Sequence, residues 1–378
     1  MAEVFNWHLN RTMQYPYEEA RPERQFSMIM DPNKCIACQT CTVACKQAWT
    51  WGKGQEYEFW NNVESKPYGS YPVGWDVKSL SLLGDQTWEG DTYTGKTVFE
   101  SAPQGEIVAG WRPDSEEWAY PNLGEDEPSG MVERGTYLGE LPQAIWMFYL
   151  QRICNHCTYP ACLAACPRKA IYKRPEDGIV LVDQERCRGY RECMKACPYK
   201  KILFNNTTRV SEKCIACFPY LEKEEMNRCV IACIGRIRLS GYLSQPGAAD
   251  PSRPIDFLVH ERKVVRPLYP QFGTEPNVYY FPPINVPLDF LEQMFGPGAE
   301  QAVEGYKAAM RGDDPELRGL LMLFGATDKV IHRFEVIDDV ATGYGVDGVA
   351  VASVPVREPV YIRPFRDDAS GAVRANIT

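Results

Sequence analysis

The feature that most constrains this chain is a run of four cysteines, Cys35, Cys38, Cys41 and Cys45, with the spacing C-x2-C-x2-C-x3-C. Thiolates at this spacing are typical ligands of cubane iron–sulfur clusters. The fourth cysteine of such a run ligates the neighbouring cluster in proteins that hold two. One run therefore predicts a partner run elsewhere in the chain.

Three further runs follow, and the four runs together contain all 15 cysteines. The later runs are Cys154, Cys157, Cys162 and Cys166; Cys187, Cys193 and Cys197; and Cys214, Cys217, Cys229 and Cys233. Four complete runs would need one more cysteine. The third run has Tyr190 where its second thiolate would stand.

Other uses of cysteine fit this pattern less well. Thiols three residues apart in repeated runs are poor disulfide partners and good metal ligands. Zinc ribbons use separated C-x2-C pairs that close one tetrahedral site, whereas these compressed runs with shared fourth ligands suit cubanes. We therefore favour iron–sulfur clusters over disulfides and zinc.

The ends of the runs indicate how they pair. The second run ends in Cys-Pro at Cys166, and the third ends in Cys-Pro at Cys197. Only 20 residues lie between the last cysteine of the second run and the first cysteine of the third. Closing so short a loop costs little entropy. These two runs are expected to form one module, and the first and fourth runs to form another across a long insertion.

Exchange of fourth ligands within each pair then predicts four sites. The predicted ligand sets are Cys35, Cys38, Cys41 and Cys233 (4Fe-4S); Cys45, Cys214, Cys217 and Cys229 (4Fe-4S); Cys154, Cys157, Cys162 and Cys197 (4Fe-4S); and Cys166, Cys187 and Cys193 (3Fe-4S), with Tyr190 at the vacant position. Three iron contents are considered for the last site: no fourth iron, a fourth iron bound by the Tyr190 phenolate, or a fourth iron bound by water. We favour the first, because a tyrosine side chain ionises only near pH 10 and is a poor ligand at neutral pH. His156 could be a ligand, but its site already has four thiolates, so a packing role is favoured.

The predicted fold class is α+β, with two ferredoxin-like modules, a long insertion and a C-terminal α/β extension. The predicted boundaries are 1–30 for an N-terminal arm, 31–45 with 211–240 for the first module, 46–150 for the insertion, 151–210 for the second module and 241–378 for the extension. The tryptophans of the insertion could be core, but docking against another subunit is favoured for the insertion and the extension.

Local patterns predict several elements. We expect a hairpin over 170–183, a strand role for 202–210, a short helix over 46–51 and a strand over 257–265. Two amphipathic helices are expected, over 288–310 with a break near Gly296 and over 315–324, followed by strands within 330–337 and 349–362.

Charge and motifs narrow the function. Residues 150–240 contain 17 Lys and Arg against 9 Asp and Glu, although the whole chain carries a net charge of −9. A cationic environment compensates buried anionic clusters, whereas the acidic remainder argues against a nucleic-acid partner. The chain matches the P-loop pattern at 90–97 and GxGxxG at 343–348, but neither match lies between an expected strand and an expected helix, as a nucleotide-binding loop requires. An electron-transfer subunit is therefore favoured over a self-sufficient enzyme. A third class of function is that of a structural protein, in which redox-inert clusters would only stabilise the fold.

The four runs, together with residues 152–162, 172–180, 187–190 and 272–277, resemble the iron–sulfur β subunit of type II DMSO-reductase-family molybdopterin complexes. This group includes nitrate reductase, nitrite oxidoreductase, perchlorate and selenate reductases, and hydrocarbon and dimethyl sulfide dehydrogenases. Residues 6–9, 21–25 and 54–64 look most like nitrite oxidoreductase. Members of the family often have Trp where this chain has Tyr190.

The resemblance implies an electron-transfer role without a substrate site in this chain. The first site would face a molybdopterin catalytic α subunit, and the three-iron site would face a haem b γ subunit or another acceptor. Nitrite oxidation or nitrate reduction is the favoured activity of the complex. No stretch is long and apolar enough to span a bilayer, and residues 1–31 show neither an apolar signal region nor twin arginines. We therefore expect membrane association only through partners, and export as the passenger of a twin-arginine partner or a place at the cytoplasmic face.

Overall fold

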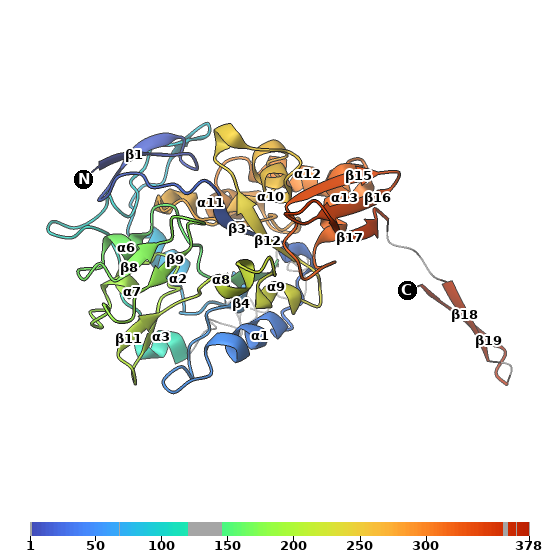
Figure 1. The fold of residues 1–378 in the computed structure, drawn as a ribbon, viewed down its shortest axis with the longest axis horizontal. Helices are drawn as coiled ribbons and strands as arrows, with labels where there is room; N and C mark the ends of the chain where they lie inside the picture. The colour runs from blue at the N-terminus through green and yellow to red at the C-terminus, as the bar shows by residue number, and fades with distance from the viewer. Residues whose placement is uncertain (1, 68, 120–145, 358–361, 368, 378) are drawn as a thin grey trace, which may run out of the picture.

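The protein has a mixed α+β fold, shown in Figure 1 as a computed structural model. The structure describes residues 2–67, 69–119, 146–357, 362–367 and 369–377. Part of the predicted insertion, residues 120–145, lies outside these ranges. In Figure 1 the helices α1 and α6–α9 lie on one side of strands β3 and β12, and the C-terminal helices lie on the other.

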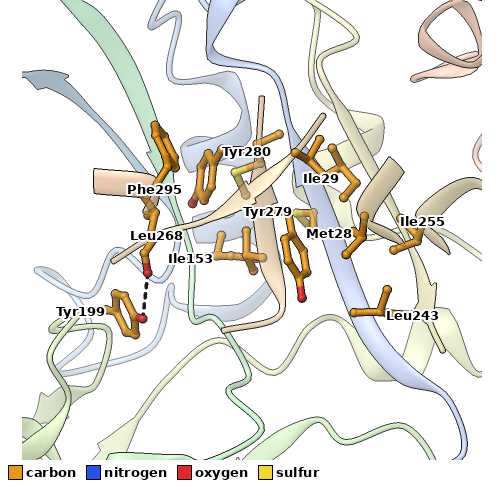
Figure 2. Packing of buried hydrophobic residues seen from close by; sticks show 14 of the residues in the cluster. Met28, Ile29, Ile153, Tyr199, Leu243, Ile255, Leu268, Tyr279, Tyr280 and Phe295 are labelled. Carbon is orange, nitrogen blue, oxygen red and sulfur yellow. Dashed lines mark hydrogen bonds between the residues drawn. The ribbon is translucent and has the colours of Figure 1, made fainter. Parts of the chain in front are cut away.

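A four-stranded sheet in the order β12-β3-β14-β13 forms the centre. Strand β3 (Gln25–Met30) pairs antiparallel with β12 (Arg238–Leu243) and parallel with β14 (Val278–Tyr280), and β13 (Arg266–Pro267) closes the edge. All six residues of β3 are buried, because the strand is flanked on both edges and covered on both faces. Figure 2 shows Leu243 and Ile255 to one side of β3 and Tyr280 and Phe295 to the other.

The N-terminal segment belongs to this core. Strands β1 (Ala2–Asn6) and β2 (Arg11–Tyr15) form a hairpin. The Asn6 side chain donates to the carbonyl of Gly273 at 3.0 Å, and the Tyr15 hydroxyl donates to that of Pro160 at 3.3 Å. The predicted boundary at residue 30 therefore divides β3 from its partner β12. A local pattern could show the strand but not its pairing with residues more than 200 positions away.

The cysteines lie on and between short elements. The helices are α1 (Thr40–Trp49), α6 (Ala161–Ala164), α7 (Glu192–Ala196), α8 (Phe218–Leu221) and α9 (Arg228–Ile231), and two hairpins join them: β8 (Ile171–Lys173) with β9 (Val180–Val182), and β10 (Leu203–Asn205) with β11 (Val210–Glu212). The hairpin predicted over 170–183 is confirmed. The helix expected at 46–51 begins earlier, at Thr40, and so contains Cys41 and Cys45.

The described part of the insertion packs into the body. Its elements are β4 (Asn62–Lys66), α2 (Trp75–Leu80), β5 (Trp88–Glu89), β6 (Thr92–Tyr93) and α3 (Ser115–Ala119). Strand β4 pairs with β7 (Phe148–Arg152), which leads into the second cysteine run. Trp75 is fully buried under the Arg152 guanidinium, whereas Trp51 is 79% exposed. Trp60 and Trp75 are buried, and Trp88, Trp111 and Trp118 are half-buried against the core, so these tryptophans do not by themselves indicate docking.

The C-terminal region adds helices and a small sheet. Helices α11 (Leu288–Phe295), α12 (Ala299–Arg311) and α13 (Pro315–Leu323) confirm the predicted pair with its break, and β15 (Arg333–Ile337), β16 (Val340–Tyr344) and β17 (Ala350–Pro355) form a sheet. Strands β18 (Ile362–Asp367) and β19 (Ala372–Ile377) form a hairpin. Within the described residues, no helix is long and apolar enough to cross a membrane.

The strand predicted over 257–265 is wrong. Helix α10 (Pro254–Asp256) runs into a π-helical turn, Phe257–Glu261. Pro254 favours a helix start, and Phe257 packs against Phe334 at a ring distance of 5.1 Å. Tertiary packing here outweighs the strand propensity of the apolar side chains.

Candidate iron–sulfur sites

Four small cavities collect the cysteines into four sets. Site A is lined by Cys35, Cys38, Cys41 and Cys233; site B by Cys45, Cys214, Cys217 and Cys229; site C by Cys154, Cys157, Cys162 and Cys197; and site D by Cys166, Cys187, Cys193 and Tyr190. Each set combines thiols from two different runs. The structure thus brings together the residues that the spacing argument grouped.

Helix packing explains how the runs exchange their fourth cysteines. Helix α1 packs against α9, and α6 packs against α7. Cys41 and Cys45 stand one turn apart on α1, so they point along one face but at different heights. Cys41 consequently lines site A, and Cys45 lines site B beside Cys229 of α9.

The backbone repeats in each run, and this repeat places Tyr190. The residue before the second ligand position has positive φ in every run: Ala37 at 53°, His156 at 42°, Gly189 at 68° and Ala216 at 53°. Side chains other than glycine adopt this conformation only at a cost of about 1–2 kcal/mol. The turn is therefore imposed by the site, and Tyr190 follows it as Cys38, Cys157 and Cys217 do in their runs.

Hydrogen-bond donors point at the sulfurs. Backbone N–H groups of His156, Ala216, Ala170 and Ser211 donate to Cys154 (3.4 Å), Cys214 (3.3 Å), Cys166 (3.3 Å) and Cys187 (3.4 Å). The Trp49 indole donates to Cys217 at 3.2 Å. Donors that converge on sulfur stabilise thiolates, so the residues present fit anionic iron–sulfur clusters.

Burial and charge act in opposite directions at these thiols. Burial raises the pKa of Cys193 and of Cys229 to about 12 each, which disfavours a bare thiolate. Buried basic side chains lie beside the thiols: Lys201 lines site C, Arg238 lines site A, and Lys200 and Lys213 lie near Cys197 and Cys214. Burial also lowers the pKa of Lys200 and of Lys201 to about 7. Within the described residues, no three His, Cys, Asp or Glu side chains are arranged for a single metal ion.

The sites form a series. Sites A and B share helix α1, and Arg238 donates to Cys41 of site A and lies near Cys229 of site B. Burial is the main reason that the pKa of Cys214 is raised, and the nearby Cys154 thiol is the second. Because Cys214 lines site B and Cys154 lines site C, these two sites are neighbours. Cys162 of site C and Cys193 of site D belong to one apolar cluster. The order is therefore A, B, C, D.

Both ends of the series reach the surface. Cys38 of site A is exposed, and Tyr190 of site D is 60% exposed. The cysteines of sites B and C are buried or half-buried. The two terminal sites are thus the ones that a partner can approach most closely.

His156 has a packing role. Its Nδ1 accepts the backbone N–H of Val180 at 3.1 Å, and its ring lies edge-on to Phe26. Burial lowers its pKa well below the ordinary value, so the ring is neutral. It is not among the residues that line site C.

The charge count of residues 150–240 predicted a cationic surrounding for the clusters, but it did not identify the individual buried basic residues or Trp49. A buried lysine and an exposed one look alike in a sequence, and the only signal for Arg238 is its place five residues after Cys233, where the Cys-Pro runs have isoleucine.

Comparison with known proteins agrees with this chemistry. Residues 145–242 match a family model described as a 4Fe-4S dicluster domain. The β subunit of selenate reductase from Thauera selenatis is 44% identical over 74% of this chain and 89% of its own length. The chlorate reductase β subunit of Ideonella dechloratans is 43% identical (81% and 98%), and the respiratory nitrate reductase β subunit of Haloferax mediterranei is 40% identical (84% and 95%).

The paired cysteine sites and the dicluster match define an iron–sulfur protein of the 4Fe-4S class. Within that class, the chain belongs to the family of β subunits of type II DMSO-reductase-family enzymes, as the identity to these relatives over most of their length shows.

Proposed function

We propose that the chain relays single electrons through three 4Fe-4S clusters, at sites A, B and C, and one 3Fe-4S cluster, at site D. Iron–sulfur clusters supply one-electron centres whose potentials the protein sets through hydrogen bonds, charge and exposure. The observation that carries the proposal is the unbroken series of four cysteine-lined sites with both ends at the surface. The ligands are the cysteines that line each site.

Site A is proposed to face a molybdopterin catalytic α subunit. Exposed apolar side chains surround it: Ile36 is 68% exposed, Val43 51% and Ile234 65%. Permanent interfaces are more apolar than ordinary surface, and exposed apolar patches mark interaction sites. A stable subunit contact therefore suits this end. The insertion and the C-terminal extension are proposed to add to it.

Site D is proposed to exchange electrons with a haem b γ subunit or another acceptor. Its rim carries Arg168, Arg188 and Arg191 against one acidic residue, Glu192. This rim differs from the apolar surroundings of site A. The two ends are thus suited to different partners.

The activity proposed for the complex is nitrite oxidation or nitrate reduction, on the likeness of residues 6–9, 21–25 and 54–64 to nitrite oxidoreductase. The alternative is the same relay in a perchlorate, selenate, chlorate or hydrocarbon-hydroxylating complex. The alternative has its own support, because the selenate and chlorate relatives are 44% and 43% identical and the nitrate relative 40%.

A substrate test on the purified complex distinguishes the proposed activity from its alternative. Reduced complex is offered nitrate, chlorate, perchlorate and selenate in turn, and oxidised complex is offered nitrite and a hydrocarbon. Turnover with nitrite or nitrate as the best substrate supports the proposal, and a marked preference for another substrate would replace the proposed activity.

Export as the passenger of a twin-arginine partner is also proposed, with a place at the cytoplasmic face of the membrane as the alternative. The N-terminal sequence of the α subunit tests this proposal, because a passenger needs a partner with a twin-arginine signal.

Two rival classes predict different behaviour. A self-sufficient enzyme would turn over substrate without the α subunit, and a structural protein would hold clusters that do not titrate. A redox titration of the isolated chain, with a substrate screen, separates both from a relay.

A further inference from the structure

Arg238 is a buried cation between two of the sites. It begins strand β12, and its side chain is 1% exposed. Nη2 donates to Cys41 Sγ of site A at 3.0 Å, and Nη1 donates to Asn61 Oδ1 at 2.8 Å. Nε is buried without a partner among the described residues.

The countercharge of Arg238 comes from thiols of both sites. Nη2 contacts Cys41, the guanidinium lines the same cavity as Cys35 and Cys233, and Cys229 lies close to it on the other side. Cys229 belongs to site B and the others to site A. No carboxylate of the described residues forms an ion pair with Arg238 within 4.0 Å. An unpaired buried guanidinium is strongly unfavourable, so the anionic sites are its partners.

The corresponding positions in the other module are apolar. In three runs the chain makes the same turn after the last cysteine. The third residue after that cysteine has positive φ (Lys169 at 49°, Lys200 at 50°, Arg236 at 50°). Its backbone N–H donates to the carbonyl of the cysteine at 3.1 Å. Two residues further on stand Ile171, Ile202 and Arg238. Ile202 lines site C as Arg238 lines site A.

The two junctions therefore differ in charge. Ile171 and Ile202 belong to the apolar cluster that contains Cys162 of site C and Cys193 of site D. Cys41 and Cys229 are the third cysteines of their runs, as Cys162 is in the second run. The junction of A and B thus holds a guanidinium where the junction of C and D holds isoleucine.

We propose that Arg238 is an electrostatic tuning residue shared by sites A and B, which raises the reduction potentials of both clusters and leaves those of C and D unchanged. Reduction adds negative charge to a cluster, and a nearby buried cation that donates to a ligand sulfur stabilises the reduced form. The inference rests on the proposed function, because it requires clusters at these sites.

The test is a redox titration of the intact complex, followed by electron paramagnetic resonance. Arg238→Ile places at this position the residue that its counterparts carry. Two of the three cubane potentials should fall, and the third cubane and the three-iron centre should not move. Unchanged potentials, or an equal shift of all four centres, would overturn the proposal.

A second variant guards against failure to assemble. Asn61→Asp keeps the size of the side chain and places a carboxylate on Nη1, which neutralises the guanidinium where it stands. The same two potentials should fall, and no shift would contradict the proposal even if Arg238→Ile does not fold. Arg236→Gln removes an exposed charge from the same segment and should shift nothing. Absence of cubane signals from the wild type would instead refute the proposed function itself.

Discussion

The Arg152 guanidinium donates to Glu64 Oε2 at 2.8 Å across the strand pair β4–β7, and this buried ion pair joins the insertion to the strand that leads into the second cysteine run. The Trp75 indole donates to the same carboxylate at 2.8 Å, and Lys66 lies 3.5 Å away and pairs with Asp76 at 2.6 Å. The network fixes β7, and through it the approach of the chain to Cys154.

Glu64→Gln is expected to destabilise the fold by about 3–5 kcal/mol, because removal of one partner leaves buried cations uncompensated. The measurement is the thermal loss of cluster absorbance in the purified chain. Glu300→Gln, on an exposed position of α12, is the control and should change little. Equal melting of the two variants would show that the network contributes nothing.

The pH dependence of this difference follows from the pKa of Glu64. Burial alone would raise that pKa, but Arg152 and Lys66 outweigh it and hold the pKa below its ordinary value. A carboxyl with a lowered folded-state pKa contributes stability above its unfolded pKa of ~4.3, and the contribution is lost as pH falls through the folded value. The gap between wild type and Glu64→Gln should therefore be full at pH 7 and shrink in acid below about pH 4. A gap that grows in acid would contradict this account.

Tyr190→Cys is expected to convert the three-iron centre of site D into a cubane of lower potential, because it restores the missing thiolate at a position whose backbone already matches the other runs. Electron paramagnetic resonance of the oxidised protein should show the three-iron signal in wild type and its loss in the variant. Tyr172→Cys, an exposed tyrosine on β8, is the matched control and should keep the signal. A wild type without a three-iron signal but with a fourth iron at site D would make Tyr190 or water a ligand.

Ile36→Glu combined with Ile234→Glu should release the chain from its catalytic subunit and leave its clusters intact. Charged side chains in an apolar interface lose hydration without gaining a partner. Co-purification measures the loss, and iron content measures the clusters. Ile36→Val with Ile234→Val keeps the apolar surface and should keep the complex. Retention of the subunit by the glutamate variant would move the interface elsewhere.

Much of the site could be predicted from sequence, because short spacings leave a thiolate few places to reach. The grouping of Cys45 with Cys214 and of Cys197 with Cys154 followed from run endings, and the structure places these thiols together. The helices over 288–311 and 315–323 followed from periodicity and from Gly296 and Pro315.

The remainder depended on tertiary contacts that leave no local pattern. The pairing of β3 with β12 and β14 joins residues far apart in the chain. Trp75 and Trp51 look alike in sequence, but one is buried and the other exposed. In the sequence, Arg238 cannot be told apart from other basic residues. Only its position at the start of β12 shows that it lies between sites A and B.

Whether the four sets of side chains hold three cubanes and one three-iron cluster is tested by the iron, acid-labile sulfide and zinc content of the purified chain together with its spectrum. We expect iron and sulfide in the proportions of three 4Fe-4S and one 3Fe-4S cluster per chain, with a single three-iron signal in the oxidised state. Stoichiometric zinc with little sulfide would contradict it.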